Sequence, residues 1–237
     1  MDALQTLVLA GALAALATPG DDNRLTDEDR KAGWLLLFDG KHAADWVRSD
    51  DGSAVTDKVI EGGALTPRNQ PGPLLVYGKK QFGDFVLRCD VKMAEPSANS
   101  GIFFRVADLK NHVETGLEVQ VLDPEQAKKH SPYWSFGAVY DLAKPEKNTL
   151  RGPGEWNAVE LRCEGPHVTV AVNGEVVSRL NCDDFSEPGR RPDGTPHKYK
   201  GAVKDFARSG FIGLQSGWEG KSWFKNLRLL ELKTPAK

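Results

Sequence analysis

Alternation of apolar and polar residues along short stretches is the feature that most constrains how this chain folds. In residues 84–93, one face carries Phe85, Leu87, Cys89 and Val91, and the other carries the polar residues Asp84, Arg88, Asp90 and Lys92. A period of two places successive side chains on opposite faces of a β-strand. The pattern returns in residues 159–164 and 167–172. The 24 glycines and 14 prolines among 237 residues add many turn positions, so the sequence predicts an all-β protein.

About ten short strands are expected, with no helical periods between them. They lie at residues 34–38, 59–66 (folded about Gly62-Gly63), 84–93, 101–106, 116–122, 137–141, 159–164, 167–177, 210–215 and 222–232. Asn173-Gly174 is the dipeptide most typical of a two-residue hairpin turn. This spacing predicts one domain over residues 33–232, a sandwich of two antiparallel sheets with minor helical turns, and a tail at 233–237.

The N-terminal segment has the pattern of a secretory signal peptide. An apolar run over residues 7–17 ends in Ala15-Leu16-Ala17 and is too short for a stable membrane span. The segment before it contains Asp2 and neither Lys nor Arg, so a buried N-terminal helix is the alternative. We expect a signal peptide at 1–17, a linker and short helix at 18–32 that begins at the Thr26 cap, and a periplasmic or secreted protein without a membrane span.

Charge and cysteine content exclude some classes of partner. A net charge of −2 and a pI near 6.2 make nucleic acid an unsuitable partner. The three cysteines lie far apart and fit no zinc motif. Cys89 and Cys163 fall on inward faces and are interpreted as core residues, with a disulfide between them as the alternative.

Residues 183–209 form a long charged loop, either a lid over a binding face or a surface crossing.

The strand at 116–122 carries the best candidates for a functional site. Alternation places Glu118 and Gln120 on one face and the apolar residues between them on the core side. Two polar side chains in the middle of a sheet suggest a concave carbohydrate-binding face. If Arg105 of the neighbouring strand shares that face, it forms a charge pair or an anion-stabilising site with Glu118.

Several other residues have both a structural and a functional interpretation. Asp123 begins an Asp-Pro-Glu-Gln stretch typical of a helix N-cap, although its carboxylate is also a catalytic candidate. His130 is a helix-capping, metal-binding or proton-donating candidate. Trp134 and Trp218 lie in loops and are the better candidates for stacking on sugar rings, and Tyr140 is a candidate hydroxyl donor.

Nine motifs, in order, resemble the 3-keto-disaccharide hydrolase domain family. They are Gly33-Trp34 with Leu37-Phe38-Asp39-Gly40-Lys41 and Trp46, Asp84-Phe85 with Leu87, Asn99-Ser100-Gly101-Ile102-Phe103-Phe104-Arg105, Glu118-Val119-Gln120-Val121-Leu122-Asp123, Gly137-Ala138-Val139-Tyr140-Asp141, Gly154-Glu155-Trp156-Asn157, Val172-Asn173-Gly174, Gly213-Leu214-Gln215 and Trp223-Phe224-Lys225-Asn226-Leu227. The resemblance covers roughly residues 33–232 and implies a concanavalin A-like jelly roll in an exported bacterial protein. Many members carry His-Gly after the Gly-Leu-Gln strand, whereas this chain has Ser216-Gly217-Trp218.

The family resemblance implies activity on sugars whose C3 hydroxyl has been oxidised to a ketone. Glu118 is then the candidate base for the C2 proton and Arg105 the stabiliser of the enolate. Tyr140 or Asp123 is the candidate acid for the leaving group. The remaining substrate-binding candidates are Asn99, Gln120, His130, Trp134, Gln215 and Trp218. The sequence assigns no cofactor. A divalent metal held by Glu118, Asp123 or His130 is the alternative to Arg105 at the enolate oxygen.

Two other functions remain open at this stage. A glycosidase of the beta-glucanase type would pair the carboxylates of Glu118 and Asp123. A non-catalytic carbohydrate-binding module would use the same sheet face together with Trp134 or Trp218.

Overall fold

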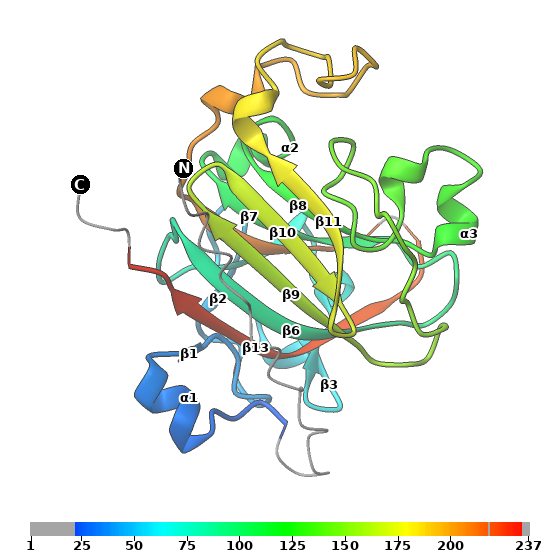
Figure 1. Cartoon of the computed structure of the whole chain (residues 1–237). Coiled ribbons are helices and arrows are strands. Elements are labelled where there is room, and N and C mark those ends of the chain that lie inside the picture. The colour runs from blue at the N-terminus through cyan, green and yellow to red at the C-terminus, as the bar shows by residue number, and fades with distance from the viewer. Residues whose placement is uncertain (1–21, 218, 234–237) are drawn as a thin grey trace.

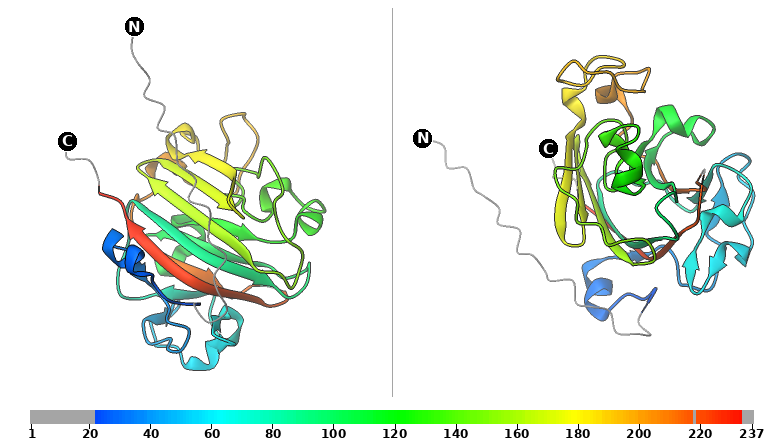
Figure 2. Two further views of the ribbon diagram at one scale, coloured as in Figure 1. Left: turned by 60° about the horizontal axis from the view of Figure 1, so that its bottom comes forward. Right: turned by 90° about the vertical axis from the view of Figure 1, so that its right-hand side faces the viewer.

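The computed structural model describes residues 22–217 and 219–233, and its strands form two antiparallel sheets packed face to face. We call the eight-stranded sheet A and the five-stranded one sheet B. Figure 1 looks onto the outer face of sheet A, with sheet B behind it, and Figure 2 shows the two curved layers from other sides. The predicted all-β sandwich of two antiparallel sheets is confirmed.

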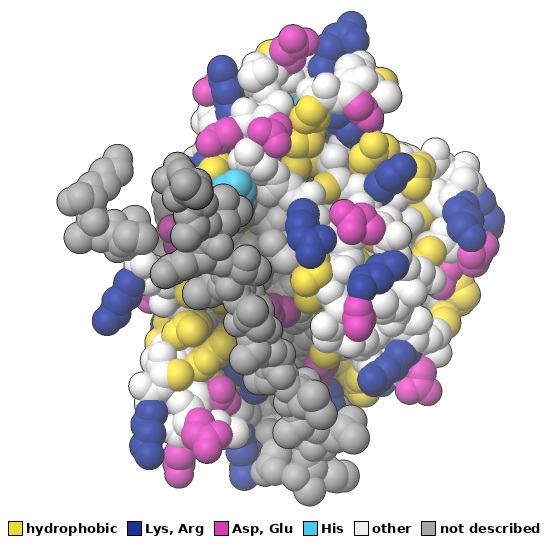
Figure 3. Space-filling view, viewed as in Figure 1, with side chains coloured by type: hydrophobic (Ala, Val, Ile, Leu, Met, Phe, Trp, Pro, Cys, Tyr) yellow, Lys and Arg dark blue, Asp and Glu magenta, His cyan; other side chains and the backbone are white. Residues whose placement is uncertain are grey.

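Sheet A has the order β11-β10-β9-β6-β13-β4-β3, and β1 pairs with β13. Its strands are β1 (Leu35–Leu36), β3 (Ile60–Glu61), β4 (Ala64–Leu65), β6 (Phe85–Met93), β9 (Asn157–Glu164), β10 (His167–Val172), β11 (Glu175–Asn181) and β13 (Ser222–Glu231). On its outer face acidic and basic side chains are interspersed wherever Figure 3 is not grey. One such pair joins Arg88 to Glu160 across β6 and β9, at 2.7 Å between Nε and Oε2.

Sheet B has the order β2-β5-β12-β7-β8, so that β8 forms one edge. Its strands are β2 (Trp46–Arg48), β5 (Leu74–Tyr77), β7 (Ser100–Val106), β8 (Leu117–Val121) and β12 (Phe211–Gln215). The sequence patterns indicated β7, β8 and β12 but not the short strands β2 and β5. Residues 137–141 do not form the expected strand: only Val139 makes isolated bridges, to Val119 and Ala143.

The core lies between the two sheets and follows from the alternation. Phe85, Leu87, Cys89 and Val91 of β6 are all buried in it, opposite apolar residues of sheet B. Burying these side chains removes apolar surface from water, which is the main favourable term in folding.

The disulfide between Cys89 and Cys163, the alternative to two free core cysteines, is not formed. β6 and β9 are neighbours, but Cys163 lies opposite Phe85 and Cys89 lies opposite Val159, so the register keeps the two thiols apart. All three cysteines are free and buried, and burial raises the pKa of the Cys89 and Cys163 thiols. They act as small apolar core residues, as the first interpretation predicted.

Helical structure is limited to short pieces, the first of which was predicted. Helix α1 (Asp27–Ala32) begins with a capping box between Thr26 and Asp29 and ends at Gly33, whose φ of 89° suits glycine. The others are α2 (His112–Thr115), α3 (Pro124–Ala127) and the 3₁₀ turns η1 (Asp57–Val59), η2 (Pro67–Asn69), η3 (Leu109–Asn111), η4 (Pro132–Trp134), η5 (Cys182–Asp184) and η6 (Val203–Asp205).

The predicted signal peptide at 1–17 lies outside the described residues. Within 22–217 and 219–233, no helix has the length and apolar character needed to cross a membrane.

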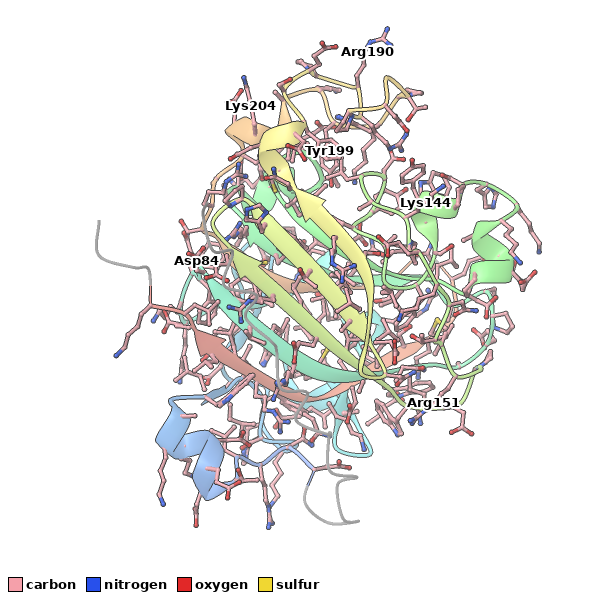
Figure 4. All side chains as sticks on the ribbon, viewed as in Figure 1. Asp84, Lys144, Arg151, Arg190, Tyr199 and Lys204 are labelled. Atoms are coloured by element: carbon pink, nitrogen blue, oxygen red, sulfur yellow. The ribbon has the colours of Figure 1, made fainter. Side chains whose placement is uncertain are left out.

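The long segment between β11 and β12, residues 183–209, is here called the strap. It forms the top of the molecule in Figure 1 and contains most of η5 and all of η6. Its exposed tip folds back on itself through a bridge between Arg190 and Pro196. Its inner part is anchored by buried residues, among them Arg191, His197 and Tyr199. Figure 4 marks Arg190 at the tip and Tyr199 at the base.

Candidate functional site

Glu118 and Gln120 project from β8 onto the outer face of sheet B, as predicted. Leu117, Val119 and Val121, which alternate with them, belong to the core cluster between the sheets. The two polar side chains are nevertheless only 2% and 3% exposed. The predicted concave face is therefore a shielded site in this structure rather than an open surface.

Gly101 makes room for the carboxyl group of Glu118. In the ladder between β7 and β8, Gly101 lies opposite Gln120 and Phe103 lies opposite Glu118. A Cβ atom on Gly101 would lie 1.9 Å from Oε1 of Glu118. The carboxyl group thus lies directly over the glycine backbone, in a place that no other residue type leaves free.

The Glu118 carboxyl has the electrostatics of a tuned acid–base group. Oε1 is buried and has no hydrogen-bond partner among the described residues. Burial raises the pKa of Glu118 to about 8, and the nearby charge of Lys198 acts in the opposite direction. A carboxyl group with a pKa near neutrality is a stronger base than an ordinary glutamate and is a functional-site candidate.

Asn99 and Gln120 form an amide pair beside Glu118. Nε2 of Gln120 donates to Oδ1 of Asn99 at 3.0 Å. This contact leaves an amide donor on Asn99 and an acceptor on Gln120, both suited to binding sugar hydroxyl groups. The structure thus brings together Glu118, Gln120 and Asn99 of the predicted site.

Tyr140 joins the same group from the loop that follows α3. Its backbone N–H donates to the carbonyl of Glu118 at 2.8 Å. Burial, reinforced by the charges of Glu118 and Asp141, raises the pKa of the Tyr140 phenol. The hydroxyl therefore keeps its proton at neutral pH and remains able to donate it.

Lys198 of the strap is a site residue that the sequence did not reveal. Its Nζ lies 4.4 Å from the ring centroid of Tyr140. Burial lowers the pKa of Lys198, while the charges of Glu118 and Asp141 oppose that shift. The unusual length of residues 183–209 was the one signal that this segment reaches a functional face.

Arg105 is not at the site, which corrects the expectation that it faces Glu118. Between Phe103 and Val106, β7 has one residue more than β12, and Arg105 has a φ of 51°. Such a β-bulge redirects the side chain. The buried guanidinium instead bonds Oδ1 of Asp84 at 2.9 Å and the Gly165 carbonyl at 2.8 Å, linking the two sheets. Figure 4 shows Asp84 on a different side of the molecule from Tyr199.

Trp134 does not offer a free face to a sugar ring. It stacks between His130 and Tyr140, with ring centroids 5.6 Å apart on each side. His130 is exposed and forms the outer end of this stack. The indole Nε1–H of Trp134 is still free to donate a hydrogen bond, because it is buried without a partner among the described residues.

Asp123 is the N-cap of α3, as its structural interpretation predicted. Its Oδ1 accepts the backbone N–H of Glu125 at 2.8 Å. Asp123 therefore caps α3 and His130 stacks on Trp134. The Glu118 carboxyl lies apart from them, over Gly101. Within 22–217 and 219–233, no three His, Cys, Asp or Glu side chains converge as metal ligands do. Glu118, Asp123 and His130, the alternative candidates for holding a divalent metal, do not form such a group.

The remaining predicted residues lie on or beside β12. The Gln215 side chain is half-buried, and its Oε1 has no partner among the described residues. Ser216, the residue after it, accepts from Gln70 Nε2 at 2.8 Å and donates to the Gly72 carbonyl at 2.6 Å. Trp218 lies outside the described residues.

An open hollow of about 620 Å³ lies elsewhere on the molecule. It is lined by Ser49, Asp50, Asp51, Gly52, Ala107, Asp108, Leu109, Lys110 and Phe211. None of the residues predicted for the site lines it.

The fold together with the family match defines a carbohydrate-active β-sandwich domain. The chain belongs to the family of 3-keto-alpha-glucoside-1,2-lyase-like domains, which it matches over residues 33–230. It is also similar to two solved structures from Parabacteroides distasonis, each described as a "putative glycosyl hydrolase". Both are 26% identical to it: one covers 84% of this chain and 99% of its own with a TM-score of 0.70, the other 90% and 100% with a TM-score of 0.72. No curated protein matches the chain.

Proposed function

We propose that this protein cleaves the glycosidic bond of 3-keto-glycosides by removing the proton at C2. The observation that carries the proposal is the buried Glu118 carboxyl, whose Oε1 has no partner among the described residues and whose pKa is raised to about 8. Membership in the lyase-like family supports the substrate class. A base of this strength suits a carbon acid that a neighbouring ketone has activated.

The reaction balances without a redox partner. Glu118 takes the C2 proton, and the electron pair forms an enolate onto the C3 oxygen. The enolate then collapses to a C1–C2 double bond, and the C1–O bond breaks as the leaving oxygen takes a proton. Water adds at C1 of the resulting enone, and a proton returns to C2, which gives net hydrolysis.

The neighbouring groups have separate roles in this proposal. Lys198 replaces Arg105 as the cation that stabilises the enolate oxygen, because it comes from the strap beside Glu118. Tyr140 donates the proton to the leaving oxygen. Asn99 and Gln120 orient hydroxyl groups through the free atoms of their amide pair.

The first alternative is an ordinary glycosidase, which requires a second carboxylate at Asp123. That carboxylate caps α3. Replacing Asp123 with Ala should lower the free energy of unfolding by about 1 kcal/mol through loss of the cap. Turnover per folded molecule should be unchanged, and its loss would favour the paired-carboxylate mechanism.

A chromogenic 3-keto-glucoside tests the proposal directly. The purified chain should release the chromophore, and Glu118→Gln should reduce kcat at least about 100-fold while the protein stays folded. Glu28→Gln, an exposed change in α1, is the matched control and should keep full activity. Binding of oligosaccharide without cleavage of either plain or 3-keto substrates would instead indicate a binding module.

We also propose that the protein is exported, on the apolar pattern of residues 1–17. Expression of the full chain in a Gram-negative host, followed by fractionation, should place a shortened protein outside the cytoplasm. A full-length protein in the cytoplasm would contradict this.

A further inference from the structure

The strap crosses the candidate site between two acidic side chains. The backbone N–H of Lys198 donates to Oδ2 of Asp141 at 2.7 Å, and that of Lys200 donates to Oε2 of Glu114 at 3.0 Å. Between them, Tyr199 is buried in the core cluster and meets Phe206 edge to face. These contacts fix the backbone on both sides of Lys198.

Arg191 holds Asp141 from the other side. Its Nη2 lies 2.7 Å from Oδ1 and 2.8 Å from the backbone carbonyl of Asp141, and its Nε lies 3.0 Å from the same carbonyl. Its Nη1 donates to Thr195 Oγ1 at 3.1 Å within the strap tip. The guanidinium also covers the ring of Tyr133 at 3.7 Å. Only 8% of Arg191 is exposed, so this is a desolvated, multiply bonded pair.

Asp141 is attached directly to the catalytic candidates. It follows Tyr140, whose N–H bonds the Glu118 carbonyl, and its φ of 59° lies in the left-handed region. A non-glycine residue keeps such a conformation only where its surroundings hold it. The Asp141 carboxylate thus bonds two groups of the strap at once, the Arg191 guanidinium and the Lys198 backbone N–H.

We infer that Asp141, held by Arg191, is a positioning residue that fixes the strap so that the Lys198 ammonium stands over the Tyr140 ring, next to Glu118. The 4.4 Å from Lys198 Nζ to the Tyr140 ring centroid is the result of that arrangement. The role assigned to Lys198 rests on the proposed function, whereas the positioning itself does not.

Several ionisable groups surround Glu118 and Lys198 and have to be considered in any titration. They come from the strap, from the loop after α3 and from α2, and they are Tyr199, Tyr140, Asp141, His112 and Glu114. Loss of the Asp141 charge alone would make Glu118 easier to ionise and lower its pKa. Release of Lys198 would remove a favourable cation and raise it. The direction of the change therefore distinguishes positioning from a direct charge effect.

The test is the titration of Glu118 followed by ¹³C NMR of the side-chain carboxyl, assigned with Glu118→Gln. In Asp141→Asn we expect the Glu118 pKa to rise by roughly one unit, as in Lys198→Met. Arg191→Lys keeps the charge but loses the forked contact and should shift it in the same direction. Asp205→Asn, an exposed change in the same strap, is the control and should leave it unchanged.

A double variant completes the design. If Asp141 acts through Lys198, adding Asp141→Asn to Lys198→Met should raise the Glu118 pKa no further than Lys198→Met does alone. A lower or unchanged Glu118 pKa in both Asp141→Asn and Arg191→Lys, even with reduced thermal stability, would overturn the inference. The NMR readout needs no substrate. Failure to cleave 3-keto-glucosides would thus reject the proposed function and leave this test intact.

Discussion

Glu118 shows how a single residue is tuned by its place in a sheet. Gly101, which lies diagonal to it on the neighbouring strand β7, lets the carboxyl fold down against the backbone of that strand. There it loses contact with water, and burial of the charged form raises its pKa to about 8. Alternation predicted the face on which Glu118 lies. The burial could not be predicted, because it depends on segments far away in the sequence.

The first prediction at this scale concerns stability as a function of pH. The unfolded Glu118 loses its proton near its ordinary pKa of 4.5, whereas the folded one keeps it to about 8. Its contribution therefore destabilises the fold progressively as pH rises through that window and is constant above it. Relative to wild type, Glu118→Gln should gain about 2–5 kcal/mol of unfolding free energy between pH 5 and pH 8.

Urea unfolding at both pH values measures this difference. Glu28→Gln should follow the wild type, because Glu28 is exposed. A constant difference between wild type and Glu118→Gln would show that Glu118 has an ordinary pKa.

The second prediction concerns Gly101. A methyl group at this position overlaps Oε1 of Glu118, so Gly101→Ala has to displace the carboxyl. A displacement of about 1 Å at a reacting group lowers activity about 100-fold. We expect that loss in kcat/KM for a 3-keto-glucoside. Gly152→Ala adds the same methyl group where no atom lies within 4 Å, and it should leave kcat/KM unchanged.

At the scale of elements, local turn signals predicted the structure well. Asn173 and Gly174 have φ values of 52° and 85°, the left-handed pair that a type I′ hairpin requires, and they join β10 to β11 as expected. The capping box of α1 and the Asp123 cap of α3 were likewise readable from sequence. These features depend only on residues close together in the chain.

The bulge in β7 is the counterexample, because nothing in the strand pattern marks it. It depends on pairing with β12, where Gly210 allows a close approach: a Cβ there would lie 2.4 Å from the carbonyl carbon of Arg105. The extra residue turns Arg105 away from Glu118 and toward Asp84. For this reason the expectation that Arg105 shares a face with Glu118 was wrong.

Arg105 should therefore affect stability rather than chemistry. Arg105→Met leaves the Asp84 carboxylate without its buried partner and should cost about 3–5 kcal/mol of unfolding free energy. Arg88→Met removes the half-exposed pair with Glu160 and should cost at most about 1 kcal/mol. Denaturant titration and kinetics at a temperature where both are folded check this. If the pH profile of kcat/KM changes in Arg105→Met, Arg105 acts at the site after all.

At the scale of the whole molecule, the two sheets provide a rigid wall and the strap completes the site on it. β8 is an edge strand, and the segments beside it supply Tyr140 and Lys198. The sequence predicted the sandwich and the residues on β8, since both follow from alternation. Lys198 could not be predicted, because its place depends on the contacts of Asp141 with residues 50 and 57 positions away in the chain.

The central claim is that Glu118 removes the C2 proton, and turnover in D₂O tests it most directly. Wild-type protein acting on a 3-keto-glucoside should release 3-keto-glucose that carries deuterium at C2, followed by NMR against the spontaneous exchange of the free product. Glu118→Gln should lose cleavage and enzyme-dependent exchange together. Cleavage by the wild type with the original C2 hydrogen retained, or undiminished exchange in Glu118→Gln, would contradict the account.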